Sequence, residues 1–485
     1  MELVKTLLLY KESNSYIVYL VLTNIKIDRL GGDNMQENIL GSEKIPRLFI
    51  KYSIPAIIAM VITGMQAVVD GIFVGNVLGP NAMASVNIAA PFMQVIIALS
   101  MIMSIGSQSY MGLSLGDGNV AKTQNIFKTA MIFILVFGFG ITVFGFTMNS
   151  QIAYVLGASD ILLKDVSLYI KTLSVFTIPM SLMFLFGFSG RIMEKPQLYF
   201  YGSILSLFAN ITLNYTLIYK LKLGIVGAAT ATGLAYSLAF LVVVWPALNK
   251  KNIINVFVGK FDKSVIFPVI YNGSSEGINS IATATSAYLF NMAFMNIAGE
   301  TGVAAFTAIN YVAQFGVLSM FGISDGIGPI VSYNYGSKKF DRVKAIMKLS
   351  DKVIITIGII IFTLLFFFGR NLVNIFVNGN EEILNIASVG AKIYAFAFFV
   401  NGFNIVNSGY FTAIGYAKES VIVASCRGLI FIIIGIFTLP NIFGINGIWM
   451  SVPFAELITL FIGIKLMKKS YKVMDKKYEI SINGA

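Results

Sequence analysis

Histidine is absent from this 485-residue chain, and cysteine occurs once, at Cys426 in an apolar stretch. Zinc, haem and iron–sulfur centres are usually held by these two residue types, so such centres lack their normal ligands here. A catalytic triad that depends on histidine is excluded for the same reason. We therefore expect a protein that is not an enzyme and that has no resident cofactor.

Charged residues are also scarce: they make up 12% of the chain, against 56% apolar residues. An ordinary soluble domain has about 25% charged residues, so this chain has too little polar surface to coat a soluble globule. Apolar runs of the roughly 20 residues that cross a bilayer recur along its length. Twelve such runs are predicted, at residues 50–76, 86–113, 126–148, 165–189, 197–219, 224–248, 265–296, 303–333, 350–369, 385–412, 419–440 and 444–467.

These runs predict an all-α polytopic membrane protein in contact with the lipid bilayer. Only helices and closed barrels satisfy the backbone within lipid, and the runs are too long to be the alternating segments of a barrel. Basic residues gather in alternate connections, for example at Lys122, Lys250 and Lys338, with Arg191 and Lys195 counted among them. Such connections are typically cytoplasmic, so we expect both termini in the cytoplasm and the chain in a bacterial cytoplasmic membrane. The net charge of +12 then reflects topology and indicates no nucleic-acid partner.

The first 42 residues are expected to be a separate N-terminal segment. The charges of Lys11 and Glu12 interrupt its apolar stretch, which argues against a signal peptide. Gly31 and Gly32 can be encoded by a purine-rich tract two codons before Met35, as a bacterial ribosome-binding site would be. We therefore predict that translation starts at Met35 and that residues 1–34 are an upstream artefact.

A sequence repeat with a constant offset of 220 residues organises the rest of the chain. The offset aligns Gly79 with Gly299 and Gln94 with Gln314, and it aligns "LGIVG" at 223–227 with "FGING" at 443–447. Both halves begin on the same side of the membrane, so the repeat is parallel and a binding site is expected between the halves. The predicted organisation is an N-lobe at residues 43–248, a cytoplasmic linker at 249–264, a C-lobe at 265–468 and a basic cytoplasmic tail at 469–485.

Asp70 is the only charged residue in the apolar part of the first run, within "QAVVDGIFVG" at 66–75. A carboxylate is costly inside a membrane and is usually kept there for a function. Gln66 precedes it by one helical turn, Asn210 and Asn214 form a similar stripe in the fifth run, and Thr232 lies in "GAATATG" of the sixth. The alternative for the neutral side chains is hydrogen bonding between packed helices.

Glu276 and Asp325 of the second half are expected to contact the substrate or to carry a proton. Gln66 of the first half is a candidate for the same role. Asp325 is followed by glycines and a proline, so an unwound helix or a water-filled cavity is expected around it. Asn401 and Asn404 line one face of the tenth run and are candidates for the same site.

Four sequence motifs are distinctive as a combination. They are "VVDGIFVGNVLG" in the first run, "ANITLNYTLIY" and "GIVGAATATG" in the fifth and sixth, and "GPIVSYNYGSKKFDRV" at the end of the eighth. Together they resemble the motifs of the multidrug and toxic-compound extrusion (MATE) transporters. The resemblance covers about residues 43–470. It implies a V-shaped pair of six-helix lobes that alternate between outward and inward access. It also implies an antiporter, expected to be a monomer, that exports organic cations and other amphipathic drugs against inflowing Na⁺ or H⁺.

The resemblance further implies an ion-coupling site in the N-lobe, which falls here on Asp70, Asn210, Asn214 and Thr232. A Na⁺ ion at Asp70 is the only metal that this site leads us to expect. Some members of the family have an acid at the position of Asn214. The asparagine leaves Asp70 as the only charge in the site, and the choice between H⁺ and Na⁺ stays open.

Many members of the family also pair an acid on the seventh helix, which Glu276 matches, with an acid on the tenth. This sequence has Asn401, Asn404 and Asn407 in that tenth helix. Glu276 is therefore interpreted as a proton carrier or as an anion that faces a cationic substrate.

Two other functions stay open at the level of sequence. A flippase for a lipid-linked saccharide would be expected to carry basic residues in its central cavity, whereas the intramembrane charges here are mostly acidic. Arg427 is expected either to pair with Glu456 or to extend toward the membrane surface. A channel or a non-transporting receptor is the other alternative, and neither would export a substrate against its gradient.

Overall fold

The computed structural model of the chain describes residues 38–377 and 380–483, and every structural statement below refers to them. The described part consists of helices joined by short connections, and it contains no strands. The predicted start at Met35 and the segment before it lie outside the described residues.

The first half of the chain forms helices α3 to α11, several of which end in a short π or 3₁₀ turn. Their bounds are α3 Ile39–Ser42, α4 Ile45–Phe73 with a π turn at Val74–Leu78, α5 Pro80–Gly116, α6 Val120–Thr147, α7 Asn149–Val155, α8 Leu163–Ser174, α9 Thr177–Ile192, α10 Gln197–Asn214 with a π turn at Tyr215–Lys220, and α11 Gly224–Val244 with a 3₁₀ turn at Trp245–Leu248.

The second half forms helices α12 to α19. Their bounds are α12 Lys263–Gly336, α13 Phe340–Val377, α14 Glu381–Ala395 with a 3₁₀ turn at Phe396–Phe399, α15 Asn401–Ala413, α16 Ala417–Ser425 with a π turn at Cys426–Ile430, α17 Phe431–Thr438, α18 Pro440–Phe443 and α19 Ile445–Asn483.

These helices account for the twelve predicted spans. Nine helical stretches of the described chain are long and apolar enough to cross a membrane, and α8 with α9 forms a tenth span that is bent by 50°. The 74-residue α12 contains two spans, because Gly299 has non-helical dihedral angles (φ 59°, ψ −152°) in its middle. α10 with its π turn, over 197–220, supplies the remaining span. The prediction of a twelve-helix membrane protein is confirmed.

Helix boundaries follow the local sequence. The side chain of Asn119 accepts a hydrogen bond at the start of α6, Asp262 does so at the start of α12 and Asn380 at the start of α14, as is typical of N-terminal caps. Pro80 occupies the first turn of α5, where its missing N–H has no cost. Gly79 before it has φ 88°, a conformation that glycine adopts readily.

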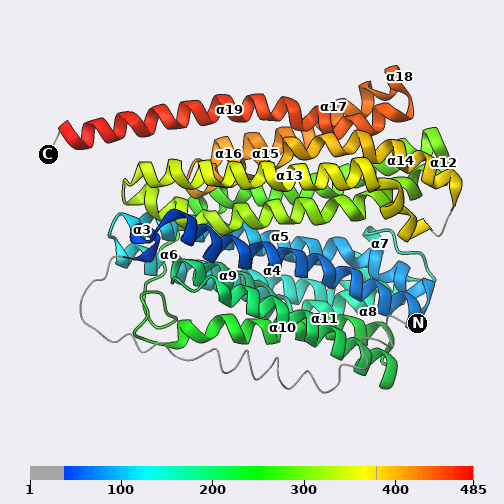
Figure 1. Cartoon of the computed structure of the whole chain (residues 1–485). Helices are drawn as coiled ribbons and strands as arrows, with labels where there is room; N and C mark the ends of the chain where they lie inside the picture. The colour runs from blue at the N-terminus through cyan, green and yellow to red at the C-terminus, as the bar shows by residue number, and fades with distance from the viewer. Residues whose placement is uncertain (1–37, 378–379, 484–485) are drawn as a thin grey trace. The chain divides into compact units, whose positions relative to one another are not determined.

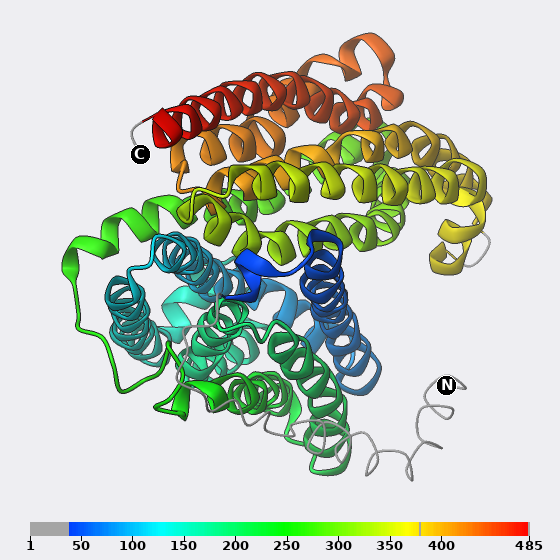
Figure 2. The same cartoon turned by 60° about the vertical axis from the view of Figure 1, so that its left-hand side comes forward.

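The helices of the described chain form two groups. α4 to α11, blue to green in Figure 1, form one group, and α13 to α19, yellow to red, form the other; the turned view keeps the same grouping (Figures 1 and 2). α12 packs mainly against α5 and α4 of the first group while also contacting α13 and α15 of the second. The two-lobe arrangement predicted from the repeat is therefore confirmed, and α12 is the helix through which the lobes meet.

The repeat is visible in the backbone itself. Three pairs of residues with positive φ are separated by 220 positions: Gly79 and Gly299 (88° and 59°), Gly118 and Lys338 (79° and 59°), and Gly224 and Gly444 (58° and 56°). Positive φ is unfavourable for most residues, so its recurrence at one offset marks equivalent turns in the two halves. Lys338 adopts it without being a glycine.

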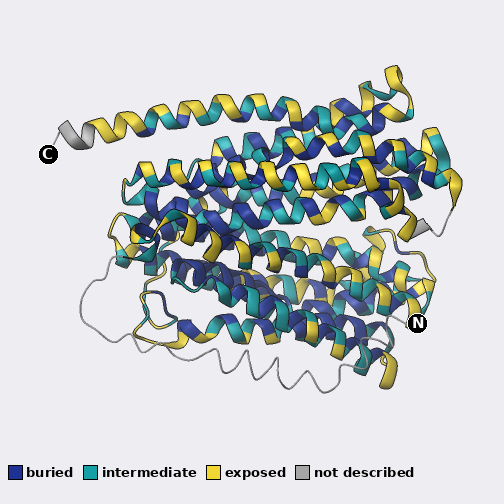
Figure 3. Ribbon diagram, viewed as in Figure 1, coloured by how far each residue is buried: buried dark blue, intermediate teal, exposed yellow. Residues whose placement is uncertain are grey.

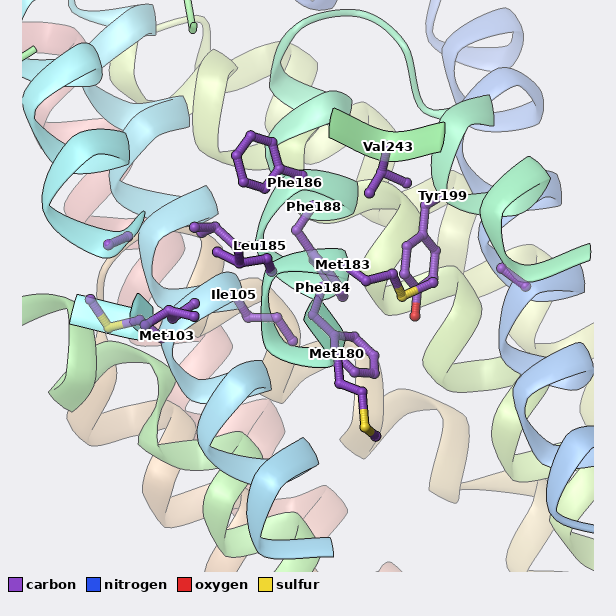
Figure 4. Packing of buried hydrophobic residues seen from close by; sticks show 14 of the residues in the cluster. Met103, Ile105, Met180, Met183, Phe184, Leu185, Phe186, Phe188, Tyr199 and Val243 are labelled. Atoms are coloured by element: carbon purple, nitrogen blue, oxygen red, sulfur yellow. The ribbon is translucent and has the colours of Figure 1, made fainter. Parts of the chain in front are cut away.

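The core of the first lobe surrounds α9, which is buried on all sides from Met180 to Ile192. Figure 4 shows Phe184, Phe186 and Phe188 of this helix among residues of α5, α10 and α11. The second lobe has its own core, where the rings of Phe294 and Trp449 lie 4.5 Å apart. Exposed residues run along the outer faces of the helices (Figure 3), as expected where lipid replaces water.

Glycines allow the lobes to pack closely. A Cβ atom on Gly273 of α12 would collide with the carbonyl group of Ile102 in α5, and one on Gly116 of α5 would collide with that of Tyr333 in α12. Both contacts lie in the half of α5 that leads to the α5–α6 connection. The lobes are therefore held together backbone to backbone at that end of the bundle.

Candidate functional site

Asp70 lies in the last turn of α4 and is partly buried. Its Oδ1 accepts hydrogen bonds from the amide groups of Asn210 (2.8 Å) and Asn214 (2.7 Å), and its Oδ2 accepts one from the hydroxyl of Thr232 (3.2 Å). The structure thus brings together the four residues predicted to form the ion-coupling site. They come from three helices and are separated by up to 162 residues.

The spacing of α10 and the small residues of α11 produce this arrangement. Asn210 and Asn214 are one turn apart, both fully buried, and Asn214 also donates to Oδ1 of Asn210 (3.1 Å). Thr232 follows Ala228 and Ala231, which are buried, so α11 can approach closely enough for its hydroxyl to reach Asp70.

Asp70 has no basic partner. The ion pairs among the described residues involve other acids, and Asn214 Oδ1 is buried beside Asp70 without a hydrogen-bond donor. A carboxylate, a hydroxyl oxygen and an unpaired amide oxygen are all acceptors, so the cluster can hold a proton or a small cation. No group of three or more His, Cys, Asp or Glu suited to a bound metal occurs in the described part of the chain.

Gln66 lies one turn before Asp70 and is buried. Its Oε1 accepts a hydrogen bond from the hydroxyl of Ser206 in α10 (3.1 Å), while its Nε2 is buried without a partner. Thr63, which precedes Gln66 by three residues, donates to the carbonyl of Ala59 in its own helix. Gln66 therefore continues the polar contact between α4 and α10.

Glu276 lies in α12 between two close helix contacts. Asn272, one turn earlier, donates to the carbonyl of Thr412 in α15 (2.9 Å), and Gly273 packs on Ile102 of α5. The carboxylate therefore points to the region between the two lobes. It is partly exposed, and its one hydrogen bond, from Asn279, is long at 3.5 Å.

Asp325 contacts Arg191 of α9. Arg191 is not among the site residues predicted from the sequence. Arg191 Nη1 donates to the backbone carbonyl of Asp325 (3.0 Å) and lies 3.9 Å from its Oδ2. That carbonyl is free because Pro329, four residues later, has no N–H to donate to it. The expectation of an unwound helix at Asp325 is wrong: α12 stays helical there, and Arg191 takes the place of the missing donor.

The sequence predicts that Arg191 lies in the connection after the fourth run, whereas the structure places it inside a helix. The residue is 1% exposed and lies in the last turn of α9. Its guanidinium lies over the rings of Phe188 (4.2 Å) and Tyr199 (5.3 Å). The apolar residues on both sides of it in "FGFSGRIM" are the signal that could have placed it inside.

Arg427 and Glu456 form an ion pair within the second lobe, which is one of the two alternatives predicted for Arg427. Arg427 Nε donates to Glu456 Oε1 (2.8 Å), and Asn404 Nδ2 donates to Glu456 Oε2 (2.7 Å). Asn404 is thus engaged with an acid of α19. Asn401 is buried one turn earlier, and its Oδ1 has no partner.

Comparison with known proteins gives a consistent result. The family model MatE matches residues 55–216 and 278–437, one segment in each half and more than half of the chain in total. The multidrug export protein MepA of Staphylococcus saprophyticus is 25% identical over 409 residues, which cover 84% of this chain and 90% of that protein. MepA of Staphylococcus aureus strain MRSA252 is 23% identical over 427 residues, covering 87% and 93%.

A solved structure described as the outward-facing conformation of a multidrug resistance MATE family transporter superposes with a TM-score of 0.85 at 19% identity, and covers 92% of this chain and 100% of that one. At this identity the likeness establishes the fold, and the family model establishes the relationship. With a match in each six-helix half, the chain belongs to the MATE family of membrane transporters.

Proposed function

We propose that the protein is a secondary antiporter of a bacterial cytoplasmic membrane that exports organic cations and amphipathic drugs in exchange for H⁺ or Na⁺. The observation that carries this proposal is the setting of Asp70. It is a partly buried carboxylate with three hydrogen-bond donors from two helices and no ion-pair partner.

Such a carboxylate suits a coupling role. Removing a counter-ion from a group in a membrane interior is costly, so Asp70 favours states in which a proton or cation occupies it. When the lobes rearrange and access changes sides, that occupant is exchanged. The unpaired Asn214 Oδ1 supports occupation by a cation, while the absence of a second acid in the cluster suits a proton equally well.

Glu276 is proposed to contact the substrate or to carry a proton. The same role is proposed for Asp325, Gln66, Asn401 and Asn404. The relatives named multidrug export proteins support a drug substrate. Partly exposed Glu276 provides an anion for a cationic amphipath.

The distribution of charge argues against the flippase alternative. Two arginines do lie inside the bundle, but Arg191 faces Asp325 and Arg427 is bonded to Glu456. Neither is free to hold a pyrophosphate. The close packing of α5 on α12 at one end argues against a channel, because a channel needs a path that is continuous between the two sides.

Gradient-driven transport tests the proposal directly. Purified protein is reconstituted into vesicles, and ethidium movement is followed after imposing a Na⁺ gradient or, separately, a pH gradient. Uphill movement of ethidium under either gradient is expected, and the gradient that drives it identifies the coupling ion. Movement that only equalises the two sides under both gradients would reject antiport.

A further inference from the structure

Five charged side chains meet around α12, and we call them the central charge cluster. They are Arg191 of α9, Glu276 and Asp325 of α12, Arg427 of the π turn after α16, and Glu456 of α19. Glu276 is within electrostatic reach of both Asp325 and Arg427, and Arg427 lies 5.6 Å from the ring of Phe321, one turn before Asp325. With three acids and two bases, the cluster carries one net negative charge when all are ionised.

Each of the two arginines forms an ion pair with one acid. Arg427 is hydrogen-bonded to Glu456 at 2.8 Å, and Arg191 lies 3.9 Å from Asp325 Oδ2. Of the three acids, Glu276 alone forms no ion pair with an arginine, and it has no short hydrogen bond. It is therefore the one carboxylate of the cluster whose charge stays available to a ligand.

Arg191 is fixed in its role by its surroundings. It is 1% exposed, two aromatic faces hold its guanidinium, and the carbonyl freed by Pro329 binds its Nη1. Arg191 Nη2 and Asp325 Oδ2 are both buried without a hydrogen-bond partner. Their attraction is thus the main compensation for burying each charge, and it leaves Asp325 with little attraction for a second cation.

Asp70 does not add to this charge. Ile57 of α4 lies against Gly322 of α12, at the level of Asp325, and Asp70 follows thirteen residues later, or roughly 20 Å along the helix. Its oxygens face α10 and α11. A ligand bound at Glu276 is therefore expected to interact with the central charge cluster and not with Asp70.

We propose that Arg191 is a specificity-determining residue: by neutralising Asp325 it limits the central charge cluster to one available negative charge, and so selects amphipaths with a single positive charge over those with two. The inference rests on the proposed function, since it names the class of exported drug. It assigns Arg191 a role in selection through Asp325, without direct contact with the substrate.

Ethidium and propidium provide the matched probes, because they share one aromatic ring system and carry one and two positive charges. The wild-type protein is expected to export ethidium in preference to propidium. Arg191→Gln frees the charge of Asp325 and should raise the propidium-to-ethidium ratio of export efficiency about tenfold, the effect of a unit charge acting over several ångströms in a medium of intermediate polarity. Arg191→Lys retains the charge and should keep the wild-type ratio.

The partner substitution gives the opposite change. Asp325→Asn leaves Arg191 unpaired and cancels the charge of Glu276, so export of both dyes should fall relative to that of a neutral amphipath. The double variant Arg191→Gln/Asp325→Asn has the wild-type net charge again, and ethidium export and the wild-type dye ratio should both recover. Thermal unfolding of each purified variant shows whether it is folded.

An unchanged dye ratio in Arg191→Gln, while ethidium is still exported, would overturn this inference and leave the proposed function intact. If Arg191→Gln does not fold, failure of the double variant to recover ethidium export relative to Asp325→Asn would overturn it instead. A wild-type protein that exports ethidium under neither gradient would contradict the proposed function itself.

Discussion

Asn214 donates a hydrogen bond of 2.7 Å to Asp70, from a position 144 residues later in the chain. The same Asn214 leaves its own Oδ1 buried and unpaired. An acid at position 214 would place two carboxylates in contact, whereas the asparagine gives Asp70 a donor and adds an unpaired acceptor beside it. Asp70 is thereby the single charge of a polar cluster that closes around it from α10 and α11.

Glu276→Gln is expected to weaken export of cationic dyes more than that of neutral amphipaths. The substitution removes the attraction of a carboxylate, which a neutral molecule never had. Rates for ethidium and for a neutral dye in the same vesicles give the comparison. Glu300→Gln, an exposed acid elsewhere on α12, is the control and should change neither. Equal loss for both dyes in Glu276→Gln would point to ion coupling or to structure.

Breaking the Arg427–Glu456 pair is expected to destabilise the second lobe. Arg427→Met leaves Glu456, which is 4% exposed, as an uncompensated buried charge, at a cost of roughly 3–5 kcal/mol. Arg427→Met/Glu456→Leu removes both charges and should recover most of that loss. Thermal unfolding in detergent measures both variants. A double variant less stable than Arg427→Met would show that the pair is not the stabilising element.

Gly273→Ala should disturb the packing of the lobes, because the added Cβ collides with the backbone of Ile102. A cost of about 1–3 kcal/mol is typical of such overpacking. The export rate should fall as α5 and α12 are forced apart at the end of the bundle where the two lobes pack together. Gly140→Ala in α6 is the matched control, since nothing lies within 4 Å of its added Cβ. Its stability should stay the same or rise by up to about 1 kcal/mol.

Orientation in the membrane can be tested by labelling. In a Cys426→Ala background, cysteines at Lys250 and Lys338 should react with impermeant reagents only from the cytoplasmic side, and one at Pro80 only from outside. The three positions are exposed. Labelling of Lys338→Cys from outside would reverse the topology and with it the direction of export.

The sequence was sufficient for the fold and for the Asp70 cluster. Apolar run lengths predicted the spans, and the 220-residue offset predicted the two lobes. The resemblance to the family placed Asn210, Asn214 and Thr232 near Asp70, and the structure brings them into contact. Spacing alone could not have done so, because contacts between helices depend on how each helix is rotated.

The contact between Arg191 and Asp325 could not be predicted from the sequence. A basic residue close to Lys195 and Pro196 has the same local pattern whether it lies in a loop or in the last buried turn of a helix. A proline after Asp325 predicts a broken helix only if its unpaired carbonyl finds no other donor. Arg191 supplies that donor from a helix 134 residues away, a contact that no local pattern contains.

Asp70→Asn shows whether the carboxylate of Asp70 couples transport to an ion gradient. The asparagine keeps nearly the same shape but cannot exchange a proton or balance a cation. Ethidium binding should remain measurable, uphill ethidium export under the driving Na⁺ or H⁺ gradient should be lost, and Asp70→Glu should retain part of it. Uphill export by Asp70→Asn at close to the wild-type rate would show that Asp70 is not the coupling residue and would transfer that role to Glu276 or Asp325.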